Sequence, residues 1–447
     1  MRPTLQRNCL KALAISAGLV AGLPAAHAAG TLDVVAVKAS VDKGLDGFYP
    51  HLDALYKDIH AHPELGFQET QTAAKLAREM RALGYEVTEG VGKTGIVAIY
   101  HNGPGPTVMI RTELDALPVE EKTGLPYAST AKQILNGRET FVDHACGHDL
   151  HMAVWVGVGK ALMDLRSKWS GTVMFIGQPA EETVGGAKAM LADGLFARFG
   201  KPDMGFALHV GATPYGEVEY RPGVYSSTSD ELHVVFHGRG GHGSMPAATI
   251  DPIVEMSRFI VDVQTVVSRE KDPAAFGVIT VGSVQAGVAG NVIPDQAQLA
   301  GTIRSYDPTV RQKLIAGIQR TAAAEAAMSG APAPDVSIIE GGKALVNDPA
   351  LTERTAIVLK KAFGDKASLM PAPIPASEDY SEFILAGVPS DFLSLGGVDP
   401  QAYADSIRSG KPLPVNHSPF FAPVPEPSIR TGVEAMTLAV VNVMQKK

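Results

Sequence analysis

An α/β protein with a smaller inserted α+β module is the expected fold, and three features of the chain lead to it. The first is length, because 447 residues exceed what one compact core usually holds, so two domains are expected. The second is an alternation of strand-like and helix-like stretches along most of the chain, which is typical of a largely parallel sheet. The third is a change of rhythm near Tyr225, where the order becomes strand, helix, strand, strand, helix, strand.

The first part of the α/β layer opens with a helix over 69–83, where apolar residues recur at helical spacing before Gly84. The elements expected after it are, in order, the strands YEVTE, TGIVAIY and PTVMIRTEL, a long loop over 118–145, a helix over 148–169, the strand and polar turn GTVMFIGQPAEE, a helix over 185–198 and the strand MGFALHV.

The inserted module is expected over residues 225–341. DELHVVFHG alternates like a half-buried strand, and the order of elements that it starts is that of a ferredoxin-like module. The elements that follow are a helix over 251–267, the strands FGVITVGSV and DQAQLAGTIRS, a helix over 308–328 and the strand PDVSIIEGG. The larger domain then resumes with the helix NDPALTERTAIVLKKAFG, the buried strand SDFLSLGG and a helix from about Ser428, so it is expected to comprise 29–224 and 342–447.

Residues 1–28 are expected to be a signal peptide. Three basic residues precede an apolar run over 12–23 that is too short to span a bilayer, and AHA at 26–28 supplies small residues for cleavage near Ala28. We therefore expect an exported protein, periplasmic or secreted. Its net charge would be about −11, from the formal −8 less three lost positive charges. This charge disfavours nucleic acid and anionic membranes as partners.

Residues 143–153, DHACGHDLHMA, crowd one cysteine, three histidines and two aspartates into eleven positions. After cleavage Cys146 would be the only cysteine, so no internal disulfide is possible. Burial as a small apolar residue would account for such a thiol, and so would metal ligation.

Further candidate ligands follow expected strands or lie in a downstream loop. Open α/β sheets form their sites outside the carboxyl ends of strands. A single histidine is more often an ordinary polar residue, and a Glu-Glu pair is usually a solvated turn. Their joint occurrence at strand ends and glycine turns favours a metal site. The candidate donors are one thiolate, three imidazoles and one carboxylate, enough for two divalent ions if one ligand bridges them: Cys146, His148, Glu182, His209 and His417.

The sequence resembles the co-catalytic metal amidohydrolases and peptidases that include aminoacylases, hippurate hydrolase and plant indoleacetyl-amino-acid hydrolases. The resemblance extends over nearly the whole chain after residue 28. It rests on motifs that recur in order: HAHPELGFQE, RTELDALPVEEKTGLPYAS, HACGHDLH, GQPAEE, ALHV, GGHGSMP, GNVIPD, GTIRS, SEDYSEF and NHSP. The HACGHD form is specific to the amidohydrolase branch, in which cysteine is a metal ligand.

This resemblance implies a metallopeptidase-like catalytic domain with a mixed sheet and a role for each motif residue. The five donors would bind the metal pair, with Cys146 as the bridge. Glu181 would be the general base that takes a proton from a metal-activated water and passes it to the leaving amine. Asp115 would orient a ligand or tune the site.

The inserted module would act as a lid and dimerisation domain, so the resemblance implies a homodimer or a higher oligomer. His242 would enter the partner subunit's site and stabilise the oxyanion. Asn291 and Arg304 would hold the carboxylate end of the substrate, since the guanidinium fork binds both oxygens. Each residue also has an interpretation without a catalytic role. His242 could be a structural histidine in a turn, and Arg304 could form a salt bridge on a strand face.

One motif departs from the family. Members of this branch usually have Arg-Ala-Asp-x-Asp where this chain has Arg-Thr-Glu-Leu-Asp, so Glu113 is one methylene longer than usual. His144 and His151 are expected beside the ligands. Glu378 and Asp379 match an acidic pair near the site whose role is open.

The expected protein is a metal-dependent amidohydrolase that cleaves N-acyl amino acids, with aromatic groups plausible, to a carboxylic acid and a free amino acid. The alternatives are a carboxypeptidase or dipeptidase with the same chemistry, and a non-catalytic periplasmic binding protein, which the intact Glu181 and the complete ligand set disfavour. Thiolate and imidazole ligands favour zinc, and manganese, cobalt or nickel would be tolerated.

Overall fold

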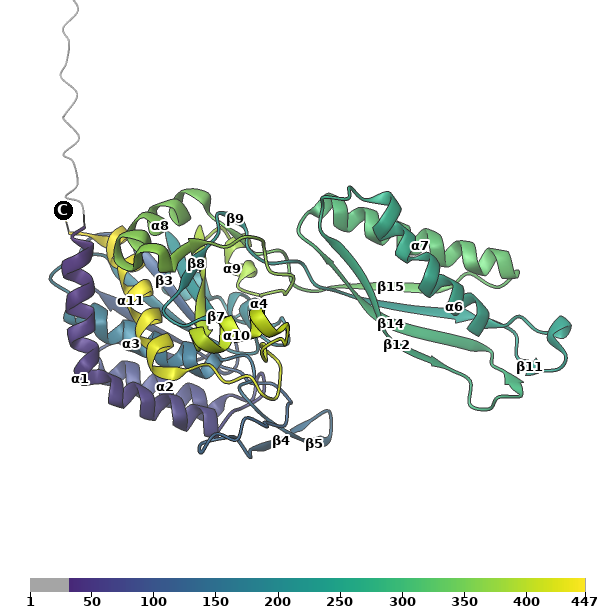
Figure 1. Ribbon diagram of the computed structural model, residues 1–447, viewed down its shortest axis with the longest axis horizontal. Helices are drawn as coiled ribbons and strands as arrows, with labels where there is room; N and C mark the ends of the chain where they lie inside the picture. Colours follow the sequence, from purple (N-terminus) through teal and green to yellow (C-terminus); the bar gives the residue numbers. More distant parts are fainter. Residues whose placement is uncertain (1–31, 447) are drawn as a thin grey trace, which may run out of the picture. The chain divides into compact units, whose positions relative to one another are not determined.

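The computed structural model describes residues 32–446, so the expected signal peptide over 1–28 lies outside the described residues. The larger part is built on an eight-stranded mixed sheet of order β1-β2-β6-β3-β7-β18-β8-β17 (Figure 1). Its central strands β6, β3, β7 and β18 are parallel to one another, whereas β1 and β2 pair antiparallel with their neighbours. Strand β8 is antiparallel to β18 and parallel to the edge strand β17. The strands are β1 (Glu86–Val91), β2 (Gly95–His101), β3 (Thr107–Glu113), β6 (Thr172–Gln178), β7 (Met204–Pro214), β8 (Val218–Tyr220), β17 (Ala367–Leu369) and β18 (Ser390–Val398).

Helices cover both faces of this sheet. On one face, Trp155 of α3 packs edge-on against Phe175 of β6, with ring centroids 5.2 Å apart. The neighbouring Met174 points to the opposite face, into a buried cluster that includes Met190 and Phe383. The first face carries α1 (Val34–Ala61), α3 (His148–Asp164) and α11 (Pro425–Met444), which contact one another, with α2 (Thr70–Ala82) against α3 and α8 (Pro349–Phe363) against α11. The second face carries α4 (Gly186–Ala192), α5 (Leu195–Phe199) and α9 (Ser381–Leu385). Because both faces are covered, the central strands are buried along most of their length.

The inserted module has the expected order of strands and helices. Its antiparallel sheet has the order β12-β14-β10-β15, which is that of a ferredoxin-like fold. Its own apolar core includes Phe236 and Phe259, whose ring centroids lie 5.5 Å apart. The elements are β10 (Asp230–His237), α6 (Pro252–Asp262), β12 (Gly277–Ala286), β14 (Gln296–Ser305), α7 (Pro308–Ser329) and β15 (Asp335–Glu340). The predicted fold class is therefore confirmed, while the boundaries at 225 and 341 stay a prediction.

Several local elements differ from expectation. The loop expected over 118–145 contains a hairpin of β4 (Lys132–Leu135) and β5 (Arg138–Phe141), because Asn136 and Gly137 adopt φ values of 51° and 77°, as a two-residue hairpin turn requires. The helix expected over 185–198 divides into α4 and α5 at Gly194, whose φ is 79°. The long helix α1 and the short elements β8, β17 and α9 were not expected from the sequence. Further unexpected short elements are β9 (Gly223–Val224), β11 (Gly241–His242), β13 (Val292–Ile293), β16 (Val346–Asn347) and α10 (Pro400–Ser409).

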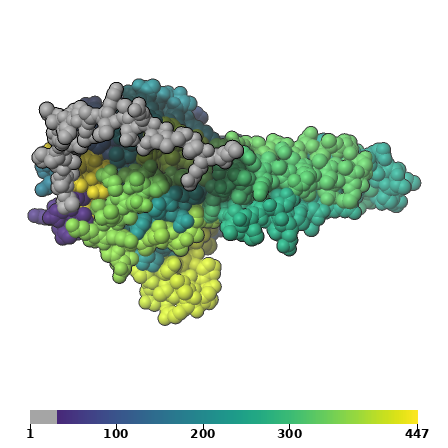
Figure 2. All heavy atoms as spheres, turned by 90° about the horizontal axis from the view of Figure 1, so that it is seen from above, coloured from purple at the N-terminus to yellow at the C-terminus, as the bar shows by residue number. Residues whose placement is uncertain are grey.

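Two surface features complete the description. Helix α10 has no buried residue, and its yellow-green spheres stand out at the surface in Figure 2. Among the described residues, no helix combines the length and apolar character needed to cross a membrane.

Candidate metal centre

Four chain segments bring the predicted donors to the carboxyl ends of the central strands. Cys146 and His148 flank Gly147 at the start of α3, and Gly147 has φ 87°. A Cβ atom at Gly147 would lie 2.5 Å from a methyl carbon of Val210, so glycine is needed for this close approach. The other donors lie in the turn after β6, on β7 and in the loop before α11: Glu182, His209 and His417.

All five predicted donors lie close together. The Cys146 Sγ atom is 3.4 Å from His209 Nε2 and 3.3 Å from His417 Nε2. The Glu182 carboxylate has Oε2 3.5 Å from His417 Nε2 and Oε1 3.9 Å from His148 Nε2. Cys146 and Glu182 therefore each lie between two histidines, which is an arrangement that two ions with shared ligands would need.

The polar atoms of this group fit a bound cation. His148 Nδ1 donates to the Asp115 carbonyl oxygen at 2.8 Å, and His209 Nδ1 donates to the Val210 carbonyl oxygen at 2.9 Å. These bonds leave Nε2 of each ring for a metal, as is usual for histidine ligands. His148 Nε2 and Glu182 Oε1 are buried without a hydrogen-bond partner. Burial lowers the pKa of His209, so its ring is neutral and its lone pair is available.

The pKa values of the acidic groups in the site are also consistent with a bound cation. Burial, and then the charges of Glu182 and Glu181, raise the pKa of the Cys146 thiol. Burial raises the pKa of Glu182 to about 7 against the opposing charge of His148, and burial with the charge of Glu378 raises the pKa of Glu181. These groups keep their protons without a cation, and divalent ions would displace the protons from the ligands.

The turn that carries Glu181 and Glu182 has an unusual backbone. Ala180 and Val184 have φ values of 48° and 54°, in the left-handed region that residues with a Cβ rarely adopt, and His417 has φ 70°. Such residues persist where surrounding contacts hold them, and they cluster at functional sites. One such contact is the Glu182 amide, which donates to Asp115 Oδ2 at 2.9 Å.

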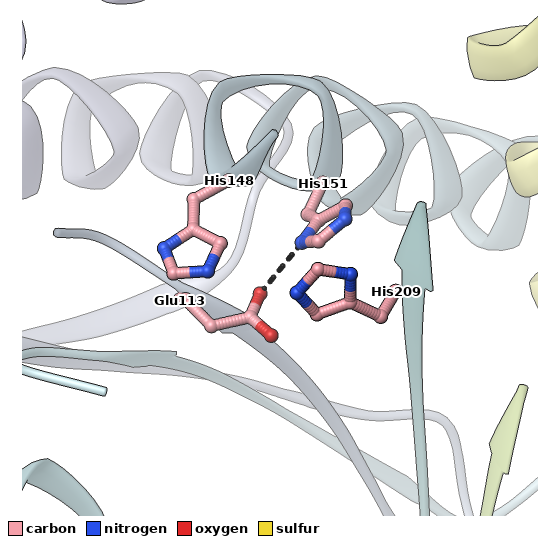
Figure 3. Close-up of side chains that lie close together, drawn as sticks. All are labelled: Glu113, His148, His151 and His209. Carbon is pink, nitrogen blue, oxygen red and sulfur yellow. Dashed lines mark hydrogen bonds and ion pairs between the residues drawn. The ribbon is translucent and has the colours of Figure 1, made fainter. Parts of the chain in front are cut away.

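His151 lies beside the donors but uses both ring nitrogens elsewhere. Figure 3 shows that the His151 ring points toward the Glu113 carboxylate, and that His148 and His209 lie beside this pair. Its Nδ1 donates to Glu113 Oε2 at 3.0 Å, and its Nε2 accepts the Val210 amide proton at 2.8 Å. His151 is therefore placed to support β7, not to bind an ion. The other expected neighbour, His144, is buried with no hydrogen-bond partner for either nitrogen.

A buried ion network surrounds Arg111, a residue to which sequence analysis assigned no role. Arg111 pairs with Glu113, lies 2.7 Å from Glu378 Oε1 and lies 3.4 Å from Asp379 Oδ1. Gln178 links Arg111 and Asp379, accepting from the Arg111 Nε at 2.9 Å and donating to Asp379 Oδ1 at 2.5 Å. The acidic pair thus has a structural partner, and Glu113 joins this network to His151.

A second missed residue holds the His417 loop. Asn416 donates to the carbonyl oxygens of Cys146 and Val210, each at 3.0 Å. The adjacent His417 amide donates to the Ala145 carbonyl oxygen at 2.8 Å. The NHSP motif was the only signal for Asn416, because its partners are main-chain atoms that no sequence pattern identifies.

His60, Glu121 and Asp143 also lie close enough to hold an ion. The His60 ring is already committed, since Nδ1 is 2.7 Å from Asp149 Oδ2 and Nε2 is 3.2 Å from Glu121 Oε2. Burial alone would lower the pKa of His60, but these carboxylates raise it to about 10, so the ring carries a proton on each nitrogen. We interpret this group as a buried ion pair network.

The predicted substrate residues of the inserted module do not join the donor group within the described chain. His242 is exposed on β11, where its Nδ1 accepts from the Ser244 amide at 3.1 Å. The main-chain carbonyl oxygen of Asn291 accepts the Gly243 amide proton at 2.9 Å, so the His242 turn and Asn291 are neighbours. Arg304 of β14 donates to Ser377 Oγ at 3.0 Å.

The fold and the donor group together define a metal-dependent hydrolase of amide or peptide bonds, and comparisons with known proteins agree. The chain belongs to peptidase family M20/M25/M40, whose sequence model matches residues 109–439. It is 34% identical to a putative amidohydrolase, YhaA of Bacillus subtilis, over 83% of this chain and 91% of that protein. It is 33% identical to thermostable carboxypeptidase 1 of Saccharolobus solfataricus, over 87% and 94% of the two chains. It is 35% identical to hippurate hydrolase of Campylobacter jejuni, over 73% and 82%.

Solved structures support the same assignment. A putative aminohydrolase from methicillin-resistant Staphylococcus aureus has a TM-score of 0.79 and 31% identity, covering 91% of this chain and all of that one. The YXEP protein of Bacillus subtilis, described as a dinuclear metal-binding peptidase of the M20 family, has a TM-score of 0.72 and 27% identity, covering 89% and 98% of the two chains.

The prediction of an exported protein is wrong. The segment that suggested export lies within residues 1–31, outside the described residues, and none of the relatives named above is described as secreted or periplasmic. The net charge of about −11 was expected for a cleaved chain, and the full sequence has a formal charge of −8 and two cysteines.

Proposed function

We propose that the protein hydrolyses the amide bond of N-acyl amino acids, giving a carboxylic acid and a free amino acid. The observation that carries the proposal is the adjacency of two carboxylates in one turn: the half-buried Glu182 lies within the donor group, and the buried Glu181 beside it is proposed for proton transfer. The relatives named amidohydrolase and hippurate hydrolase support an amide substrate of this kind.

The residues that would hold two divalent ions are Cys146, His148, Glu182, His209 and His417. Thiolate and imidazole donors favour zinc, and manganese, cobalt or nickel are alternatives that imidazole and carboxylate ligands accept. When bound, such ions lower the pKa of water to roughly 7 and polarise a carbonyl group.

Glu181 is the proposed general base. Burial and the charge of Glu378 raise its pKa, which favours a carboxyl group that can accept a proton from water. It takes a proton from the attacking water and passes it to the nitrogen of the leaving amino acid. Asp115 orients both sides of the site, since its carbonyl oxygen accepts from His148 and its carboxylate accepts from the Glu182 amide.

Substrate selection is assigned to the inserted module. Arg304 and Asn291 would bind the carboxylate of the amino acid, and His242 would stabilise the developing oxyanion from a second copy of the chain. This assignment implies a homodimer or higher oligomer formed through the module. The substrate is a small molecule, with no role for nucleic acid or membranes.

A carboxypeptidase or dipeptidase is the second candidate, favoured by the 33% identity to a thermostable carboxypeptidase. Both activities use the same donors and the same base. They differ in whether the acyl side carries a free α-amino group. A binding protein without catalytic activity is disfavoured, because the chain belongs to a peptidase family and its relatives are named as hydrolases.

The variant Glu181→Gln tests the proposed function. It should keep two metal ions per chain by elemental analysis, because Gln removes the base and leaves the five donors intact. Turnover of an N-acyl amino acid should fall at least about 100-fold, in line with the loss of general acid–base catalysis. Near-parental turnover in this variant would remove Glu181 from its proposed role.

A further inference from the structure

The motif HAHPELGFQE, residues 60–69, contains none of the five predicted metal donors, yet its last residue reaches the catalytic turn. Glu69 has no exposed surface. Its Oε1 atom accepts the Ala180 amide proton at 2.7 Å, and its Oε2 atom accepts from Thr94 Oγ1 at 2.6 Å. Ala180 directly precedes Glu181, so this contact lies one residue from the proposed base.

The Glu69 contact is made to a residue whose backbone conformation is unfavourable. Ala180 has φ 48°, a left-handed conformation that is unfavourable for a residue with a Cβ atom. The segment that carries Glu69 lies directly against the turn, since a Cβ atom at Gly66 would be 3.1 Å from the Ala180 Cα. Two buried carboxylates thus bind amides of the turn: Glu69 binds Ala180, and Asp115 binds Glu182 at 2.9 Å.

We propose that Glu69 is a positioning residue of the catalytic turn: by accepting the Ala180 amide proton, it fixes the direction in which Glu181 and Glu182 point. This inference rests on the proposed function of those two glutamates. Glu69 belongs to none of the donor groups found among residues 32–446, so it acts through the turn. Residues that orient metal ligands typically contribute about 10–100-fold to activity or metal affinity.

Three variants separate this role from a general loss of stability. Glu69→Ala removes the acceptor, whereas Glu69→Gln keeps an oxygen that can accept the Ala180 amide proton. Glu64→Ala is the matched control, because Glu64 lies in the same motif and its carboxylate binds the Thr72 amide at 2.8 Å at the start of α2, away from the turn. The full-length chain is measured with metal at saturation, and melting temperature is recorded for each variant.

Glu69→Ala should lower kcat about 10–100-fold with KM changed much less, because the turn aims the base and not the substrate. Glu69→Gln should recover most of this loss, and Glu64→Ala should keep kcat within about threefold at a similar loss of melting temperature. Equal kcat losses in Glu69→Ala and Glu64→Ala, or in Glu69→Ala and Glu69→Gln, would overturn the inference.

Cobalt absorption gives a readout that needs no turnover. With Co²⁺ bound, Glu69→Ala should change the visible ligand-field bands, since Glu182 shifts with the turn, and Glu69→Gln should restore them. Identical bands in parent and Glu69→Ala would contradict the inference even if the proposed substrate class is wrong. If Glu69→Ala does not fold, Glu69→Asp replaces it, because aspartate keeps the charge but withdraws the acceptor by one methylene. A higher kcat in Glu69→Asp than in Glu69→Gln would then overturn the inference.

Discussion

His148 and His209 each donate Nδ1–H to a main-chain carbonyl oxygen, and this choice decides which nitrogen faces the metal. Asn416 ties the loop of His417 to the main chain of Cys146 and β7. Each donor is thus oriented by a contact outside the donor group. Such contacts reduce the freedom that metal binding would otherwise have to remove.

Cys146 lies between His209 and His417, so its loss should affect the binding of both ions. Cys146→Ala should lower metal content below two ions per chain and weaken the affinity of the remaining ion about 10-fold or more. Elemental analysis after dialysis measures the content, with His144→Gln as a control for change in the same segment. An unchanged stoichiometry in Cys146→Ala would exclude the thiolate as a ligand.

The five donors could be predicted because cysteine, histidine and glutamate recur in short motifs at strand ends. Arg111, Glu69 and Asn416 could not be assigned roles in the same way. Their partners lie far away in the sequence or are main-chain atoms, as with Glu69 and Ala180, which are 111 positions apart. Only the folded chain brings these partners together.

Secondary structure elements were predictable where the apolar periodicity was strong, as in α2 and β10. The β4–β5 hairpin was missed because its residues are mostly exposed and show no buried face, although Asn136-Gly137 is a good hairpin signal. The expected helix over 185–198 was too long because Gly194 takes a left-handed conformation. The bounds of exposed helices and strands are therefore set by turn residues such as Asn136-Gly137 and Gly194 more than by apolar periodicity.

At the start of β18, Asp391 gives a pH-dependent contribution to stability. It is fully buried, Oδ1 accepts from Thr352 Oγ1 at 2.9 Å, and Oδ2 has no partner. Burial raises the pKa of Asp391 to about 6, against a usual value of 3.8. The folded state therefore holds a proton that the unfolded state releases between these pH values, so stability falls as pH rises through about 4–6 and stays lower above.

Asp391→Asn should remove this fall, because asparagine cannot ionise. The free energy of unfolding of the variant relative to the parent should increase as pH rises from 4 to 7, by about 1–3 kcal/mol given roughly 1.4 kcal/mol per pKa unit. Thermal or denaturant unfolding across this pH range measures the difference. A difference that does not vary with pH would show that the buried carboxyl does not titrate as described.

For the molecule as a whole, the order of elements was enough to predict a large α/β sheet and a ferredoxin-like module within it, whereas the mixed character of the sheet followed from the resemblance to known hydrolases. The order could do so because each part has its own apolar core, and each core imposes its own pattern on the strands. In the proposed function, substrate preference and oligomeric state are assigned to His242, Asn291 and Arg304, which lie in the module and outside the donor group. Apolar periodicity predicts which residues are buried, so it does not predict which substrate or partner these three residues contact.

The central claim is that the five donors and Glu181 form a metal-dependent centre that cleaves acylated amino acids. Its most direct test is the release of free amino acid from a panel of N-acyl amino acids and unblocked dipeptides, measured before chelation, after chelation and after zinc is restored. The account predicts release from the acylated set that the chelator abolishes and zinc restores. Release that survives complete metal removal, or no release from any panel member by the metal-loaded protein, would contradict it.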